Sequence, residues 1–240
     1  MSEENKSDTI TIKKDSLWKY STFILAALVV VGAFVFFSDN GSVTGNVANN
    51  GALPAPPQTE VTLGNDVKDD AILGDENAEV TIYEFTDFQC PYCGRHHTQT
   101  FPEIKSQYVD TGKVKYVIAD FPLTSIHPMA QPAAESAECV REQGGDESYF
   151  EYVDKLFTNQ QTLSNENFNI WSKEMGYDIS ACLSSGKYTA EVQKDAQVAQ
   201  ATGGRGTPFF VVVGKNGKGT VVSGAQPFSA FQQVIEQKLA

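Results

Sequence analysis

Positive charge is scarce in this chain. Its 240 residues include 18 Lys and Arg against 30 Asp and Glu, which gives a formal net charge of −12. Proteins that bind nucleic acid neutralise its phosphates with clustered Lys and Arg, and this acidic sequence contains no such basic patch. We therefore expect no nucleic-acid partner, and we interpret the negative charge as an aid to solubility.

Long apolar runs are also absent, with one exception near the N-terminus. Every residue from Phe23 to Phe37 is small or apolar, and the aromatic Trp18 begins this segment. Residues 18–37 have the length that spans a bilayer, which is about 20 residues. Lysines precede the segment and Asp39 follows it, so the positive-inside rule places the N-terminus in the cytoplasm and the acidic body outside.

A site for signal-peptide cleavage is missing as well. The residues from Phe36 to Asp39 do not form a small-x-small cleavage site, and no cysteine that could take a lipid follows them closely. We expect residues 18–37 to be a retained, single-pass anchor or uncleaved signal; a cleaved signal peptide is the alternative, because the strictly apolar core is short. Residues 1–17 are then a cytoplasmic tail.

The residues after the anchor divide into a linker and one folded domain. Residues 38–59 are rich in Gly, Asn, Ala and Pro and cannot bury a core, so we expect a flexible linker. Residues 60–240 are long enough to form one well-buried domain.

Cysteine is rare too, with four in the chain, and Cys90 and Cys93 form a C-x-x-C motif. The apolar run from Val80 to Phe85 precedes the motif and a helical pattern follows it. A dithiol at a helix N-terminus has a depressed thiol pKa, because the free N–H groups and the helix dipole stabilise a thiolate. Residues i and i+3 share a helical face, so Cys93 can attack a mixed disulfide formed on Cys90.

A structural zinc site is the alternative reading of this motif. Cys90, Cys93, His96 and His97 offer suitable ligands within one short span, as in a zinc-binding, chaperone-like module. Structural zinc sites usually draw a second ligand pair from a separate segment, so we favour the redox dithiol and expect neither a metal nor a cofactor.

Cys139 and Cys182 remain if Cys90 and Cys93 pair with each other. They form either a second disulfide or two buried free thiols, and the predicted export segment favours the disulfide. Such a bridge would contribute about 4 kcal/mol in the chain-entropy model.

Hydrophobic periodicity and turn residues predict alternating strands and helices. We expect strands over 79–85, 113–121, 208–213 and 219–223, and helices over 91–110 (kinked at Pro102), 128–143, 147–159, 165–176, 187–202 and 227–239. The first strand, helix and second strand form a βαβ unit with a parallel pair. Asn216-Gly217 predicts a hairpin turn between the last two strands.

Four stretches carry a resemblance to a known family. They are Glu84-Phe85-Thr86-Asp87-Phe88-Gln89-Cys90-Pro91-Tyr92-Cys93, Asp120-Phe121-Pro122-Leu123, Ala137-Glu138-Cys139-Val140-Arg141-Glu142-Gln143-Gly144 and Gly206-Thr207-Pro208-Phe209-Phe210. Over residues 70–239 the chain resembles DsbA-like thiol:disulfide oxidoreductases of the membrane-anchored type. The resemblance implies an α/β thioredoxin fold with an inserted helical subdomain at residues 124–186, preceded by the transmembrane helix.

The resemblance also implies residue roles. Cys90 would be the exposed nucleophile, Cys93 the buried resolving thiol, and Thr207-Pro208 the cis-proline loop beside them; an ordinary trans proline at a strand start is the alternative. Glu84 would be a buried acid that exchanges a proton with Cys93, or else a solvent-facing residue. We interpret His96, His97 and His127 as surface or packing residues.

The expected function is an extracytoplasmic thiol:disulfide oxidoreductase that introduces or exchanges disulfides in exported proteins. Its partners would be reduced or unfolded exported proteins and a membrane redox partner; a thioredoxin-like reductase or an isomerase is the alternative. DsbA typically has a histidine where this chain has Tyr92. Because that positive character is missing, we expect a milder oxidant.

Overall fold

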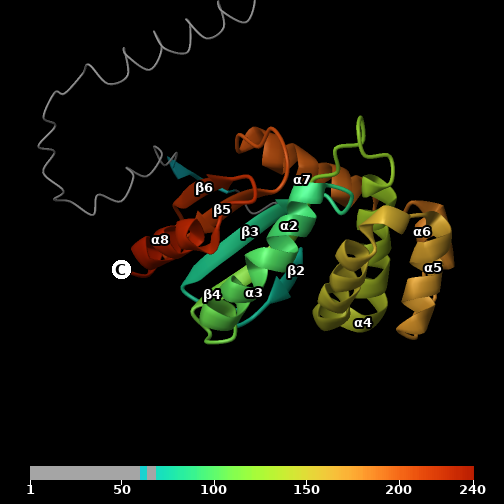
Figure 1. The fold of residues 1–240 in the computed structure, drawn as a ribbon, viewed down its shortest axis with the longest axis horizontal. Coiled ribbons are helices and arrows are strands. Elements are labelled where there is room, and N and C mark those ends of the chain that lie inside the picture. The colour runs from blue at the N-terminus through green and yellow to red at the C-terminus, as the bar shows by residue number, and fades with distance from the viewer. Residues whose placement is uncertain (1–59, 64–68) are drawn as a thin grey trace, which may run out of the picture. The chain divides into compact units, whose positions relative to one another are not determined.

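The computed structural model describes residues 60–63 and 69–240 (Figure 1). The expected cytoplasmic tail at 1–17, the anchor at 18–37 and the linker at 38–59 lie outside the described residues. In the part of the chain that is described, no helix combines the length and the apolar character needed to cross a membrane.

The centre of the folded domain is a six-stranded sheet with the order β1-β6-β5-β3-β4-β2. The strands are β1 (Glu60–Val61), β2 (Ala71–Leu73), β3 (Val80–Thr86), β4 (Val114–Asp120), β5 (Phe209–Val213) and β6 (Gly219–Ser223). Strands β3 and β4 pair in parallel, as the βαβ prediction requires, and the other pairs are antiparallel. The four strands predicted from sequence are present; β1 and β2 are too short for a periodic pattern to reveal.

Helices cover the sheet and form the insertion seen in Figure 1. They are α2 (Pro91–Gln99), α3 (Phe101–Ile104), the π-helix η2 (Lys105–Val109), α4 (Ala130–Thr158), the 3-10 helix η3 (Gln160–Thr162), α5 (Asn165–Glu174), α6 (Ser180–Ser185), α7 (Thr189–Ala201) and α8 (Phe228–Leu239). Buried side chains of α2, α4 and α8 pack on one face of the sheet, and α7 packs with Phe85 and Phe209 on the other.

The helix predictions before and after β4 fare differently. The helix expected over 91–110 ends at Gln99 and restarts at Phe101, with Pro102 in the first turn of α3, where its missing N–H leaves no hydrogen bond unmade. The helices expected over 128–143 and 147–159 are both present: they are the two parts of α4, which are separated by a non-helical Gly145 with a φ of 74°. The sequence analysis also missed α6, which is only six residues long.

The inserted helices are tied together by a covalent bond. Cys139 in α4 and Cys182 in α6 form a disulfide with a Cα–Cα distance of 5.9 Å. Of the two arrangements left open by the sequence, the structure has the bridge. It joins two cysteines that are 43 residues apart in the chain.

Candidate active site

The C-x-x-C motif lies where the central strand β3 passes into helix α2. Cys90 is the N-cap residue of α2, with an extended backbone (φ −75°, ψ 122°), and Pro91 occupies the first turn. The N–H of Cys90 donates to the carbonyl of Asp87 at 3.0 Å. Cys93 faces the core and is 0% exposed. Cys90 is also buried, at 4% exposed, so the expectation of an exposed Cys90 is wrong; the loop at Thr207 packs against its sulfur. Both thiols are free, so the structure holds the dithiol form.

The pKa values of the two thiols are shifted in opposite directions. The pKa of Cys90 falls to about 5, because hydrogen bonding by Cys93, then by Thr207, and the backbone N–H groups of Cys93 and Tyr92 stabilise the thiolate against the effect of burial. The pKa of Cys93 rises, because it is buried, because it hydrogen-bonds the Cys90 sulfur and because Cys90 and Glu84 are negative when ionised. The site therefore favours a thiolate on Cys90 and a thiol on Cys93.

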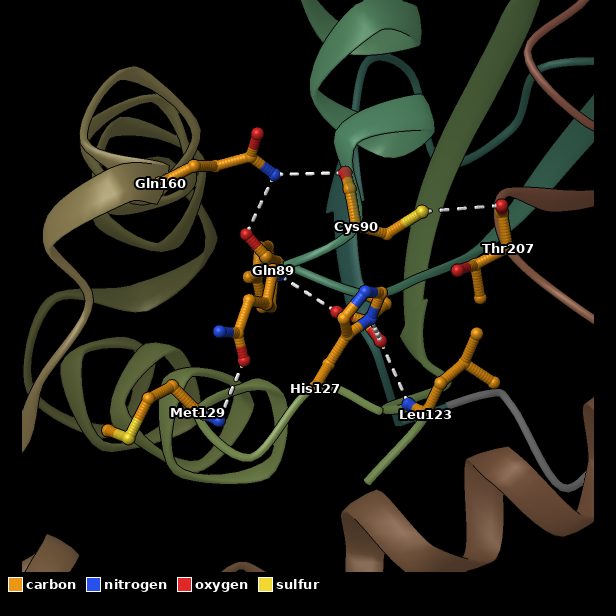
Figure 2. Close-up of polar contacts among 9 residues, drawn as sticks. Gln89, Cys90, Leu123, His127, Met129, Gln160 and Thr207 are labelled. Atoms are coloured by element: carbon orange, nitrogen blue, oxygen red, sulfur yellow. Dashed lines mark hydrogen bonds and ion pairs between the residues drawn. The ribbon is translucent and has the colours of Figure 1, made fainter. Parts of the chain in front are cut away.

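A cis peptide bond faces the first cysteine. The bond between Thr207 and Pro208 is cis, and Cys90 Sγ lies 3.5 Å from the Thr207 carbonyl oxygen (Figure 2). This contact brings together residues that are 117 positions apart. Of the two proline geometries considered from sequence, the structure has the cis form.

A buried polar chain begins at Glu84, on the strand beneath the cysteines. Glu84 is 2% exposed, and burial raises the pKa of its carboxyl group while the hydrogen bond from Tyr116 opposes that rise. Tyr116 Oη donates to Glu84 Oε2 at 2.6 Å, and His96 Nε2 lies 3.0 Å from Tyr116 Oη. The solvent-facing alternative for Glu84 is therefore wrong.

No local sequence feature marks Tyr116 as a site residue, and the sequence points to His96 only as a zinc ligand of the alternative reading or as a packing residue. The parallel register pairs Glu84 with Ile118, so Tyr116, two positions earlier on β4, lies on the same face of the sheet. The strand register is the signal that could have found Tyr116. His96 is buried, as the packing interpretation expected, but it also contacts a polar partner.

A second polar cluster holds the loop before Cys90 (Figure 2). The buried Asp87 carboxylate accepts the N–H groups of Gln89 and Leu123, each at 2.8 Å, and its Oδ2 lies 2.8 Å from His127 Nδ1. Gln89 Oε1 accepts the Met129 N–H at 2.8 Å. These bonds fix the redox loop to the segment between β4 and α4.

The helical insertion also reaches the redox loop through Gln160. Its Nε2 donates to the carbonyl oxygens of Phe88 at 2.9 Å and Cys90 at 3.0 Å (Figure 2). Gly94 makes room for this amide, since a Cβ at Gly94 would come within 2.5 Å of Gln160 Oε1. Gln160 is thus the direct polar link between η3 and the start of α2.

The histidines offered as zinc ligands have other partners. His96 Nε2 contacts Tyr116, and His97 Nε2 lies 2.7 Å from Asp154 on α4. Among residues 60–63 and 69–240, no group of three or more His, Cys, Asp or Glu is arranged to hold a metal ion.

Beside the dithiol, Tyr92 is 58% exposed, and the Arg95 guanidinium lies 5.1 Å from its ring centroid.

A comparison with protein families matches residues 66–237 to the family described as thioredoxin. The chain belongs to this thioredoxin family. Among solved structures, this thioredoxin-family protein is similar to oxidised BdbD from Bacillus subtilis (TM-score 0.65, 23% identity, 76% of this chain and 98% of that one). It is also similar to alpha-DsbA1 from Wolbachia pipientis (TM-score 0.60, 23% identity, 71% and 90%). These likenesses establish a DsbA-like α/β thioredoxin fold.

Two curated relatives differ in how much of their length is matched. The Na(+)/H(+) antiporter NhaA 3 of Salinispora tropica is 33% identical over 153 residues, which is 62% of this chain but 22% of the antiporter. A Rickettsia prowazekii protein, named as a candidate protein-disulfide oxidoreductase, is 30% identical over 165 residues, 65% of this chain and 58% of that protein. The chain thus spans about a fifth of the antiporter and little over half of the Rickettsia protein.

Proposed function

We propose that this chain is a thiol:disulfide oxidoreductase that donates disulfides to exported proteins outside the cytoplasm. The opposite pKa shifts of its two thiols, at the start of a helix and against the Thr207 loop, carry the proposal. A dithiol whose reduced form is stabilised by a thiolate is the better oxidant. A Cys90 pKa of about 5 lies between the thiol pKa values of thioredoxin, about 7, and DsbA, about 3.5, which supports a mild oxidase.

The donation proceeds in two exchanges. A substrate thiolate attacks Cys90 Sγ of the oxidised Cys90–Cys93 pair; a mixed disulfide forms and Cys93 leaves as a thiolate that takes up a proton. A second substrate thiolate then attacks the substrate sulfur of the mixed disulfide. The substrate disulfide forms, and Cys90 leaves as the stabilised thiolate, which is a good leaving group because its pKa is low. The two electrons end on the Cys90–Cys93 dithiol.

The Thr207-Pro208 loop is the proposed substrate-binding edge. Because the Thr207 carbonyl lies against the Cys90 sulfur, a peptide whose cysteine reaches Cys90 also reaches the backbone of this loop. Extended peptides bind to other proteins through main-chain hydrogen bonds of this kind, and the backbone of the loop would supply them here. Backbone pairing of this kind suits unfolded or reduced proteins of many sequences.

The proposed location rests on the sequence of residues 18–37. An N-terminal anchor would hold the catalytic domain on the outer side of the membrane, close to emerging exported chains and to a membrane redox partner that reoxidises the dithiol. A cysteine-labelling experiment tests this. In intact cells carrying the full chain, a membrane-impermeant thiol reagent is expected to label reduced Cys90; protection until the cells are lysed would contradict the location.

The reduction potential of the Cys90–Cys93 pair separates the proposed oxidase from a reductase. It would be measured in a glutathione buffer on a variant with Cys139→Ser and Cys182→Ser, so that one pair titrates. A value of about −120 to −180 mV matches known oxidants and isomerases and supports disulfide donation. A value near about −270 mV matches thioredoxin and would make the chain an extracytoplasmic reductase.

A further inference from the structure

Two of the three arginines in this chain flank the dithiol. Arg95 lies on α2, two residues after Cys93. Arg205 lies two residues before Thr207, whose carbonyl oxygen is 3.5 Å from Cys90 Sγ. Both arginines are exposed. Positive charge therefore stands on both segments that meet at the Cys90 sulfur, in a chain whose net charge is −12.

Two contacts hold Arg95 in place. Its guanidinium lies 5.1 Å from the ring centroid of Tyr92, and its Nη2 donates to the Ala225 carbonyl oxygen at 3.1 Å. Because Tyr92 is three residues earlier on α2, the Arg95 side chain runs back toward the helix start, where Cys90 lies. A guanidinium has several N–H donors, and the bond to Ala225 uses one of them. The others remain for a ligand.

The turn that accepts this bond also contacts the cis-proline. The Gly224 N–H donates to the Pro208 carbonyl oxygen at 2.9 Å, and Ala225 is the next residue. Arg95 is thus linked to the residue after Thr207, and Arg205 precedes the same loop in the chain. The two arginines border the edge to which the substrate peptide is proposed to bind.

Neither of these arginines has a carboxylate partner. Among the side chains of residues 60–63 and 69–240, no ion pair includes Arg95 or Arg205. The third arginine, Arg141, pairs with Glu138 at 3.4 Å and with Asp146 at 2.8 Å. In an acidic protein, two arginines at the redox edge are left available for a carboxylate that the chain itself does not supply.

The buried carboxyl groups near the dithiol have other partners. Glu84 accepts the Tyr116 hydroxyl at 2.6 Å. Asp87 accepts the N–H groups of Gln89 and Leu123, each at 2.8 Å. Both carboxyl groups are almost fully enclosed, so the exposed guanidinium groups face solvent and any bound substrate.

We infer that Arg95 and Arg205 are specificity-determining residues that bind carboxylates on either side of the substrate cysteine. The preferred substrates are then reduced peptides with Asp or Glu within two residues of that cysteine. This inference deepens the proposed function and rests on it for its catalytic meaning. A peptide bonded to Cys90 carries its neighbouring residues past both arginines, because residues of an extended chain are only about 3.3 Å apart. The planar guanidinium matches a carboxylate with paired N–H donors.

Two reduced dicysteine peptides that differ only in charge test this inference. One has Glu within two residues on either side of each cysteine, and the other has Gln at the same positions. For each peptide, kcat/KM is divided by the rate constant of its uncatalysed reaction with a small neutral disulfide, which removes the effect of Glu on the thiol pKa. Each arginine should favour the Glu peptide by about two- to fivefold, as in exposed ion pairs. Added salt should reduce this preference by screening the charges.

Arginine variants should lower the normalised ratio of the two peptides. Arg95→Gln and Arg205→Gln should each remove one such factor, the double variant should bring the ratio to about one, and Arg95→Lys should keep part of the preference. Lys115→Gln is the matched control. Lys115 is also a cation that donates to a backbone carbonyl, that of Glu76 at 3.2 Å, but it lies at the start of β4, away from the end that leads to the dithiol. Its loss should leave the ratio unchanged.

A ratio of about one in an active wild-type protein, or an equal loss in Lys115→Gln, would overturn the inference. Failure of the wild-type protein to oxidise either peptide would instead refute the proposed function. A second measurement then reads the preference from the mixed disulfide alone. In Cys93→Ala, single-cysteine versions of the two peptides compete for Cys90 in a glutathione redox buffer, and mass spectrometry gives their equilibrium ratio, normalised to their competition for glutathione. Equal occupancy would overturn the inference whichever way electrons flow in the wild-type protein.

Discussion

The two cysteine pairs of this chain differ in their place in the fold and in whether their sulfur atoms are bonded to each other. Cys90 and Cys93 start a helix at the end of the central strand, and their pKa values move in opposite directions. Cys139 and Cys182 come from the middle of α4 and from α6, 43 residues apart, and are bonded to each other. A helix N-terminus and an asymmetric set of hydrogen bonds shift the two pKa values of the first pair apart.

The largest expected effect separates the pairs by activity. Cys90→Ser removes the nucleophile, so the oxidation of a reduced dicysteine peptide should fall to the uncatalysed rate. The double variant Cys139→Ser, Cys182→Ser should retain activity within about threefold, because neither sulfur contacts the redox loop. A loss of activity in the double variant, with its fold intact by circular dichroism, would show that the second pair also takes part in exchange.

The second effect separates the pairs by stability. Removal of a native disulfide costs about 2–5 kcal/mol, so the double serine variant should lose this much in urea unfolding. Reduction of only the Cys90–Cys93 disulfide should cost no stability, because that disulfide closes a loop of just two intervening residues and the Cys90 thiolate stabilises the reduced form. Equal losses from both changes would contradict the assignment of Cys139–Cys182 as the structural bridge.

The third effect is the response of the redox pair to pH. A Cys90 pKa of about 5 predicts that the rate of Cys90 alkylation by iodoacetamide is level above about pH 6 and falls tenfold per unit below about pH 4. Cys93→Ala removes the first of the stabilising hydrogen bonds, so the midpoint should rise toward the ordinary thiol value. A midpoint that stays near 5 in Cys93→Ala would show that the helix N-terminus and Thr207 suffice.

This ionisation should also stabilise the reduced protein. Because the folded pKa lies below the unfolded one, the stabilisation is complete above the unfolded thiol pKa and is lost as the pH falls through about 5. The oxidised protein lacks this contribution. The difference in unfolding free energy between the reduced and oxidised forms should therefore grow from pH 5 to pH 9, which paired urea titrations would measure.

The region of the second pair should respond to pH with the opposite sign. Burial raises the pKa of Glu138, next to Cys139, to about 8, and raises Asp70 to about 8 and Asp195 to about 7. These carboxyl groups bind protons more tightly folded than unfolded, so stability should fall as the pH rises from about 4 to about 8. Urea unfolding of the oxidised protein would test this, and Glu138→Gln should flatten the slope.

The smallest expected effect concerns the contact between the two regions. Gln160→Ala removes the side-chain amide that donates to the carbonyl oxygens of Phe88 and Cys90, of which Cys90 keeps the Gly94 N–H, and should cost about 1–3 kcal/mol. Gly94→Ala should reproduce most of it, because the new Cβ displaces the same amide. Gln161→Ala is the control, since Gln161 lies in the same 3-10 helix but is exposed. Equal effects of Gln160→Ala and Gln161→Ala in urea unfolding would contradict the link.

Local features of the sequence predicted the strand, the C-x-x-C motif and the helix after it, because periodicity and helix-start signals act over short distances. The cis Thr207-Pro208 bond and its place beside Cys90 came only from the family resemblance. The contacts of Tyr116, His96 and Gln160 at the site were missed, because they depend on strand register and on the packing of the insertion. Tertiary contacts, not residue type, decide such roles.

The bonds of Gln160 and Gln89 have a consequence for protein engineering. Hydrogen bonds from η3 and from the turn before α4 hold the loop around Cys90. The loop therefore depends on parts of the chain outside the strand, the motif and the helix. If only the strand, the C-x-x-C motif and the helix were moved into another thioredoxin scaffold, the hydrogen bonds to Met129 and Gln160 would be lost. A designer who wants the same conformation of the loop should therefore transplant the helical insertion together with it.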